Sequence, residues 1–269
     1  MIRPAGRWQV VDLAELWHFR DLLFMLAKRD ILVRYKQTAL GLLWAVLQPV
    51  ITMGVLSLVL GQFIAGGKII GDTPYSLFLF AGLLPWLFFA AAVNAAGSSL
   101  VSNAGMLQKV YFPRMIVPLA AMGAPLMDAA VASGVLVVML LWYQPPMQAT
   151  ILLAPLAGFT LLIAAVGIGL LLAAWTVSYR DFRHVVPFML QVWFFITPIL
   201  VPASVLPRSL AWFNQINPVA GAIGAWRAAL LGWQIDYAAW AVSLVMSLAL
   251  LATGVVFFTH TQRRFADTV

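Results

Sequence analysis

The residues of this chain that could do chemistry are few, and most lie in short polar segments between long apolar runs. One segment, Val177–Val186, reads VSYRDFRHVV and contains Tyr179, Arg180 and Asp181. Its side chains can form ion pairs and hydrogen bonds. Arginine beside aromatic rings is typical of protein interfaces, and it is equally typical of anchoring to lipid headgroups. The residues alone leave both interpretations open.

Catalytic motifs are missing from the sequence. It has no G-x-x-x-x-G-K-S/T, so it cannot hold ATP phosphates as a P-loop does, and it has neither H-E-x-x-H nor G-x-S-x-G. The three histidines, His18, His184 and His260, are not at metal-ligand spacing, and the chain has no cysteine. We therefore expect no catalytic residues, no metal site and no cofactor in this chain, which we do not expect to be an enzyme.

Asp128 is the single one of nine acidic residues that falls well inside an apolar run. An ionisable residue at membrane depth is a candidate for function, and here it would be the titrating group of a proton-coupled carrier. The alternative is an acid that bonds to neighbouring helices or faces a wet cavity. A lipid-modifying membrane enzyme is a poorer alternative, because the acids and histidines do not cluster.

The composition predicts an integral membrane protein. Of 269 residues, 63% are hydrophobic and only 9% are charged, whereas a soluble domain has about 25% charged residues. The mean hydropathy is +0.96. Backbone polar groups in hydrocarbon must be satisfied within the segment, so we expect an all-α fold. The N-terminal residues lack the apolar core of a cleavable signal peptide.

Six apolar runs approach the length of about 20 residues that a membrane-spanning helix needs. They are Leu40–Ala65, Leu77–Ala96, Ile116–Trp142, Ile151–Val177, Val185–Val201 and Tyr237–His260. The stretch between the last two is broken by Pro202, Pro207 and Pro218, which favours short re-entrant helices on the periplasmic side. We expect a single domain over residues 1–269, with a cytoplasmic segment at 1–36 and a six-span bundle at 37–269.

The basic residues predict the orientation of these spans. Thirteen of the sixteen lysines and arginines fall before the first span, in the loops after the second and fourth spans, or after the sixth. Because such residues are retained on the cytoplasmic side, both termini should be cytoplasmic. The net charge of +7 is therefore explained by topology, and nucleic acid is not an expected partner.

The segment Asp12–Tyr35 predicts an amphipathic helix on the cytoplasmic leaflet. Asp12 and Glu15 have the spacing of a capping box, and aromatic and basic residues such as Trp17 and Arg20 follow. The helix is either a membrane anchor or a gate for an amphiphilic substrate.

Four segments, in order and spacing, carry a resemblance to a known family. They are Arg29–Pro49 (RDILVRYKQTALGLLWAVLQP), Val110–Leu119 (VYFPRMIVPL), Tyr179–Leu200 (YRDFRHVVPFMLQVWFFITPIL) and Asn217–Ile223 (NPVAGAI). Together they resemble the permease subunits of ABC-type polysaccharide exporters, which export lipid-linked O-antigen, capsule or teichoic acids. The likeness runs from about Leu26 to the C-terminus and is nearer to the O-antigen and teichoic-acid branch.

The resemblance implies a homodimer in the bacterial inner membrane, bound to two copies of a cytoplasmic ATPase that holds ATP and magnesium. It places a coupling helix at about Ser99–Arg114 and a gate at the YRD loop. The residues expected to form this coupling and gate surface are Lys109, Tyr111, Phe112, Pro113, Arg114, Tyr179, Arg180 and Asp181.

The implied substrate, a lipid-linked polysaccharide, predicts two further sites. Aromatic rings can stack on sugar faces, and the candidates for a glycan channel are Trp44, Trp86, Phe89, Trp193 and Phe194. Packing in the core or against lipid is the alternative for each ring. The lipid pyrophosphate needs cations, and Arg29, Arg34 and Lys36 are the candidates for its entry site, Arg34 above all because a guanidinium grips phosphate oxygens in pairs. Membrane anchoring is the alternative there.

Overall fold

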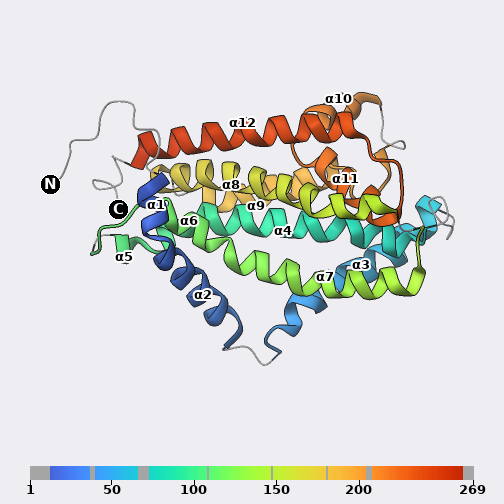
Figure 1. Ribbon diagram of the computed structural model, residues 1–269, viewed down its shortest axis with the longest axis horizontal. Coiled ribbons are helices and arrows are strands. Elements are labelled where there is room, and N and C mark those ends of the chain that lie inside the picture. Colours follow the sequence, from blue (N-terminus) through green and yellow to red (C-terminus); the bar gives the residue numbers. More distant parts are fainter. Residues whose placement is uncertain are drawn as a thin grey trace.

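The computed structural model describes residues 13–36, 40–65, 73–107, 109–146, 148–179, 181–203 and 208–262. Every regular element in these ranges is a helix, as the composition predicts (Figure 1). The elements are α1 (Leu13–His18), α2 (Arg20–Lys36), α3 (Leu43–Ala65), α4 (Tyr75–Ser102), α5 (Ala104–Leu107), α6 (Ile116–Ala121), α7 (Gly123–Tyr143), η1 (Ala149–Leu153), α8 (Ala154–Ser178), α9 (Phe182–Ile196), α10 (Arg208–Ile216), α11 (Ala220–Leu231) and α12 (Tyr237–Thr261).

Within the described ranges, five helical segments are long and apolar enough to cross a membrane. They are Leu43–Gly61, Tyr75–Ser102, Ile116–Tyr143, Ala149–Ser178 and Tyr237–Thr261. Each overlaps a run that the sequence predicts, so the prediction of an all-helical membrane protein is confirmed. The helices extend beyond several predicted ends, because helical geometry continues past the hydrocarbon boundary into the polar loops.

The run predicted as a fifth span, Val185–Val201, forms a shorter helix. α9 begins at Phe182 and ends at Ile196, and Thr197 is extended with ψ of 139°. A residue before proline avoids helical geometry, so Pro198 ends the helix here. Fifteen residues rise about 22 Å in a helix, less than the hydrocarbon core of about 30 Å.

The centre of the bundle is α4, which packs against α3, α6, α7, α8, α9 and α11. Its apolar side chains are almost all buried, and Phe78, Phe80 and Phe89 have no exposed surface. By contrast α3 buries few residues, and Ile51, Val55 and Leu58 on it are exposed. α1, α5 and the end of α12 lie at one end of the bundle, and α10 and α11 at the other (Figure 1).

α8 and α12 run parallel and very close together. Trp240, near the start of α12, donates a hydrogen bond to Thr160 of α8 at 3.1 Å. Further along, a Cβ built on Gly254 would lie 2.3 Å from the Gly167 carbonyl oxygen. Further along both helices, Phe258 of α12 and Leu170 of α8 belong to the same buried hydrophobic cluster. Small residues allow this approach, which is how helices associate in lipid.

Replacing Gly254 by Ala is therefore expected to lower the thermal unfolding temperature of the detergent-purified chain by about 5 °C. The added methyl group meets backbone and not a movable side chain, and such overpacking costs about 1–3 kcal/mol. Tryptophan fluorescence on heating measures the transition. Gly134→Ala on α7 is the matched control, because nothing lies within 4 Å of its Cβ position. Equal unfolding temperatures for both variants would contradict the close contact.

The predicted N-terminal helix is present as α1 and α2, which are separated by a turn at Phe19. α2 packs against α6 and α7. Leu26 is its buried anchor, whereas Phe24, Met25 and Val33 are exposed, so its apolar residues are not confined to the face that packs. The predicted cap residue Asp12 lies outside the described residues.

Candidate functional site

A cavity of about 680 Å³ lies beside the end of α2, between α3, α4, α7 and α9. Proline, leucine and alanine side chains make up much of its wall. Its polar members come from every side and are Arg34, Tyr35, Gln48, Thr52, Asn94, Asp128 and Gln191. A mostly apolar hollow with a few convergent polar groups is the usual form of a ligand site.

The structure divides the five predicted channel aromatics into two groups. Trp44, Trp86 and Phe194 line the cavity. Phe89 and Trp193 pack behind them, with ring centroids 5.4 Å apart, and Phe89 is fully buried. The helical rotation of α4 and α9 separates the groups, because neighbouring residues on a helix point in different directions.

Arg34 and Asp128, which the sequence singled out separately, form an ion pair at one side of the cavity. Arg34 Nη2 lies 3.0 Å from Asp128 Oδ2. The arginine side chain is 47% exposed and that of the aspartate 21%. Asp128 is thus not an isolated buried acid, since α2 supplies its cation. Lys36, two residues after Arg34, is exposed at the end of α2.

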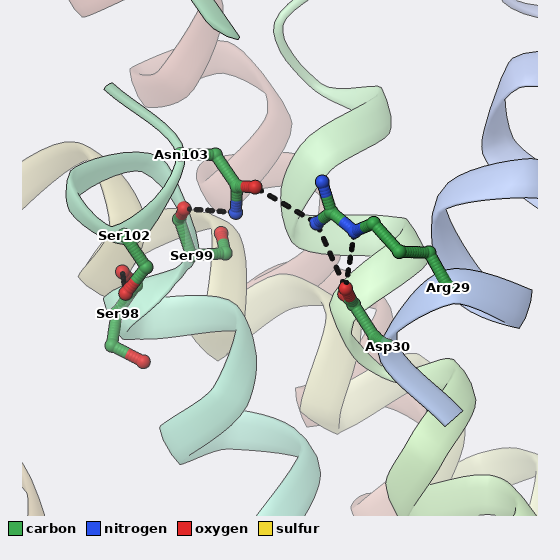
Figure 2. A network of polar contacts seen from close by, with 6 residues as sticks. All are labelled: Arg29, Asp30, Ser98, Ser99, Ser102 and Asn103. Atoms are coloured by element: carbon green, nitrogen blue, oxygen red, sulfur yellow. Dashed lines mark hydrogen bonds and ion pairs between the residues drawn. The ribbon is translucent and has the colours of Figure 1, made fainter. Parts of the chain in front are cut away.

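Arg29 has a different position from Arg34. Its guanidinium contacts Asp30 at 2.8 Å and donates to Asn103 Oδ1 at 2.8 Å. Asn103 in turn donates to the Ser99 carbonyl at 2.9 Å. Figure 2 shows Arg29 and Asp30 reaching from α2 toward the end of α4. Arg29 therefore connects α2 to the segment predicted to couple with an ATPase, and this arginine does not line the cavity.

The predicted coupling segment, Ser99–Arg114, contains the end of α4, the single turn α5 and an irregular stretch. Lys109 and Tyr111 project outward, and Tyr111 is 85% exposed. Phe112 is buried and packs with Leu26 of α2. The sequence analysis grouped these residues on one surface; in the structure Lys109 and Tyr111 are exposed and Phe112 is buried.

Arg114 holds the end of this segment to the bundle. Arg114 donates a hydrogen bond to the backbone carbonyl of Gln262, after the end of α12. Pro113 is partly buried beside it. In the second predicted loop Tyr179 and Asp181 are exposed, and Tyr179 lies 6.4 Å from Phe182 between ring centroids. Arg180 lies outside the described residues.

Sequence reasoning missed Arg227, a buried arginine on α11. Its guanidinium donates to the carbonyls of Pro198 at 3.2 Å and Ile199 at 2.9 Å, and it lies 3.9 Å from the Phe78 ring centroid. No carboxylate pairs with it in the part of the chain that the structure describes. The sequence does contain a sign of this site, namely an arginine inside the apolar stretch AGAIGAWRAALL. A charge at membrane depth needs partners within the protein.

Asn217, the first residue of the NPVAGAI segment, joins three elements. Its side chain accepts from Trp193 Nε1 at 3.1 Å and donates to Thr197 Oγ1 at 3.1 Å. Its backbone carbonyl accepts from Ser243 of α12. This hub fixes the segment after α9 against the start of α11. Across the described ranges no group of three or more potential metal ligands occurs.

The family model described as "ABC-2 type transporter" matches residues 21–231, a range that covers the cavity, the Arg34–Asp128 pair and the coupling segment.

The chain belongs to the ABC-2 type transporter family. This confirms the resemblance on which the sequence predictions drew.

The relatives of this ABC-2 chain include proteins named for two polysaccharide systems. An "O-antigen export system permease protein RfbA" of Klebsiella pneumoniae is 28% identical over 94% of this chain and 96% of that protein. One of Myxococcus xanthus with the same name is 28% identical over 95% and 98%. A "Polysialic acid transport protein KpsM" of Escherichia coli is 25% identical over 84% and 90%. The matches cover between 84% and 95% of this chain.

Proposed function

We propose that this chain is the membrane permease of an ATP-driven exporter that moves lipid-linked O-antigen across the bacterial inner membrane. The main support for this proposal is the cavity, which is lined by three of the predicted channel aromatics and by the Arg34–Asp128 pair. Aromatic rings would contact the apolar faces of sugars, and the arginine would contact the lipid pyrophosphate. The names of the ABC-2 relatives favour O-antigen as the polysaccharide.

A second copy of the chain would close the conduit. α3 and α9 flank the cavity, and both have apolar faces that are uncovered, including Leu58, Phe188 and Phe195. In the proposed homodimer these faces meet the partner copy or lipid. The two cavities would then face a shared path, along which many weak aromatic contacts let the polymer slide.

The chain is proposed to cross the membrane six times, with both termini cytoplasmic. Because α8 and α12 run parallel, the chain must traverse the bundle once between Ser178 and Tyr237. α9 accounts for most of that crossing, and α10 and α11 would be the re-entrant helices on the periplasmic side. The end with α1, α5 and the end of α12 would be cytoplasmic, since Lys109 lies in a loop there and Arg183 lies in the first turn of α9. α2 would rest on that leaflet as a gate.

The partner would be a cytoplasmic ATPase that binds ATP and magnesium, in two copies per homodimer. Its proposed contacts are the exposed Lys109 and Tyr111, together with Tyr179 and Asp181 of the second loop. The buried Phe112 and the Arg114–Gln262 bond would keep the loop rigid enough to transmit force.

Tyr111→Ala is expected to reduce co-purification of the ATPase from native membranes about tenfold, because exposed aromatic residues carry much of the energy of an interface. The thermal unfolding temperature of the purified chain should stay unchanged. Phe112→Ala is the matched comparison, and it should lower the unfolding temperature by leaving a cavity in the core. Normal ATPase capture by Tyr111→Ala would remove this residue from the proposed surface.

Deleting the gene in the source bacterium tests the function itself. Lipid-linked O-antigen should accumulate inside the cell and disappear from the surface, and an intact copy should restore it. Capsular polysaccharide is the second candidate, favoured by the relationship to the polysialic acid transport protein. Loss of capsule with normal surface O-antigen would select it.

A further inference from the structure

The Arg34–Asp128 pair connects two helices through a single contact. Arg34 Nη2 meets Asp128 Oδ2 at 3.0 Å. The other carboxylate oxygen, Oδ1, is buried and has no hydrogen-bond partner among the described residues. An arginine and a carboxylate can form two parallel hydrogen bonds, and that form is the stronger one. The ion pair therefore uses one carboxylate oxygen of Asp128 and leaves the other without a hydrogen bond in the described part of the chain.

Arg34 is the cation of the cavity whose anionic partner a ligand could replace. Asp30 is one turn earlier on α2, but Arg29 holds its carboxylate at 2.8 Å. Lys36 adds a second positive charge at the exposed end of the helix. Both members of the pair line the cavity, whose wall is otherwise largely apolar. A charged headgroup attached to a hydrocarbon chain matches this combination.

A bare arginine at a membrane surface would bind the phosphate of any anionic phospholipid. Such a phosphodiester carries one negative charge, the same as the carboxylate of Asp128, so exchanging one for the other gains little. A lipid pyrophosphate carries at least two negative charges and more acceptor oxygens, which suit the planar fork of the guanidinium. Discrimination of this kind works by penalising the wrong ligand.

We propose that Asp128 is a specificity-determining counter-ion, which a lipid-linked pyrophosphate displaces from Arg34 and which bulk anionic phospholipids do not. The inference rests on the proposed function, because it takes a lipid-linked pyrophosphate as substrate. It assigns Asp128 to substrate selection at the membrane-facing cavity and gives it no part in proton transfer.

Direct binding tests the inference without export. The full-length chain is placed in nanodiscs of phosphatidylcholine, or of an equal mixture of phosphatidylcholine and phosphatidylglycerol, and titrated with radiolabelled farnesyl pyrophosphate. Wild-type protein should bind it with nearly the same affinity in both membranes. Asp128→Asn should bind in phosphatidylcholine but lose about tenfold in the mixture, because phosphatidylglycerol then competes for Arg34. Arg34→Gln should lose about tenfold in both membranes.

Controls separate the carboxylate from net charge and from folding. Asp21→Asn removes one negative charge from a side chain on α2 that is 90% exposed and should behave as wild type. The unfolding temperature of each variant in the nanodisc establishes that it is folded. Equal inhibition of wild type and Asp128→Asn by phosphatidylglycerol would overturn the inference, as would undiminished binding by folded Arg34→Gln. Inorganic pyrophosphate binding as tightly as farnesyl pyrophosphate would refute a lipid-linked ligand.

Failure of the proposed function would look different. A gene deletion that leaves surface polysaccharide intact refutes the export role, whatever the nanodiscs show. A deletion that abolishes export, combined with equal phosphatidylglycerol inhibition of wild type and Asp128→Asn, refutes only the selection role of Asp128.

Discussion

An Arg227→Ala variant is expected to unfold about 10 °C below the wild-type protein. The guanidinium donates to the Pro198 and Ile199 carbonyls and lies over the Phe78 ring. Its removal leaves two buried acceptors unsatisfied and a cavity between α4 and α11, which together cost about 3 kcal/mol or more. Heating the detergent-purified protein and following tryptophan fluorescence measures the shift.

Two matched variants test the cause of that shift. Arg227→Lys keeps a positive charge but lacks the fork that reaches both carbonyls, so its loss should be intermediate. Gly82→Ala leaves Arg227 in place, yet its new methyl carbon would lie 1.7 Å from the Arg227 Nη2 position. This variant should also unfold at a lower temperature. A wild-type unfolding temperature for Arg227→Ala would show that the carbonyls find other partners.

A disulfide between cysteines at positions 27 and 123 is expected to abolish export. The Cβ of Ala27 lies 2.8 Å from the Cβ position of Gly123, and disulfide Cβ atoms are about 3.8 Å apart, so a separation of about 1 Å suffices. α2 also contacts the coupling segment through Arg29–Asn103 and α7 through Arg34–Asp128. Locking α2 to α7 should therefore prevent movements of the coupling segment, driven by the ATPase, from reaching the cavity.

The design uses the absence of cysteine from the sequence, so an Ala27→Cys, Gly123→Cys chain has one possible intramolecular disulfide. Surface polysaccharide is measured before and after oxidation and again after reduction. The reduced form is the matched control because it carries the same two side chains. Unimpaired export by the fully oxidised protein would mean that α2 does not move on α7 during transport.

Much of the fold could be predicted because a membrane-spanning helix is recognisable from its apolar composition alone. Runs such as Tyr237–His260 are apolar on all sides, so their length alone predicted α12. The length of α9 was harder, because its residues are as apolar as those of a full span. There the local restriction that Pro198 places on Thr197 decides where the helix ends.

The site could be predicted only as separate residues. Arg34 and Asp128 each stood out by charge in an apolar setting, but their pairing depends on how α2 crosses α7, which no local pattern contains. Phe112 and Tyr111 are adjacent aromatic residues, yet one is buried and the other exposed. In an irregular segment, no helical period indicates which side faces the core.

The parallel contact between α8 and α12 constrains how the protein is made. Gly167 stays uncovered on α8 while the ribosome synthesises the intervening residues, because the glycine that fits against it, Gly254, is on α12. The bundle described here can close only after α12 has left the translocon. Until then the half-built chain lacks the α12 donors, Trp240 and Ser243, for the Thr160 hydroxyl oxygen and the Asn217 backbone carbonyl.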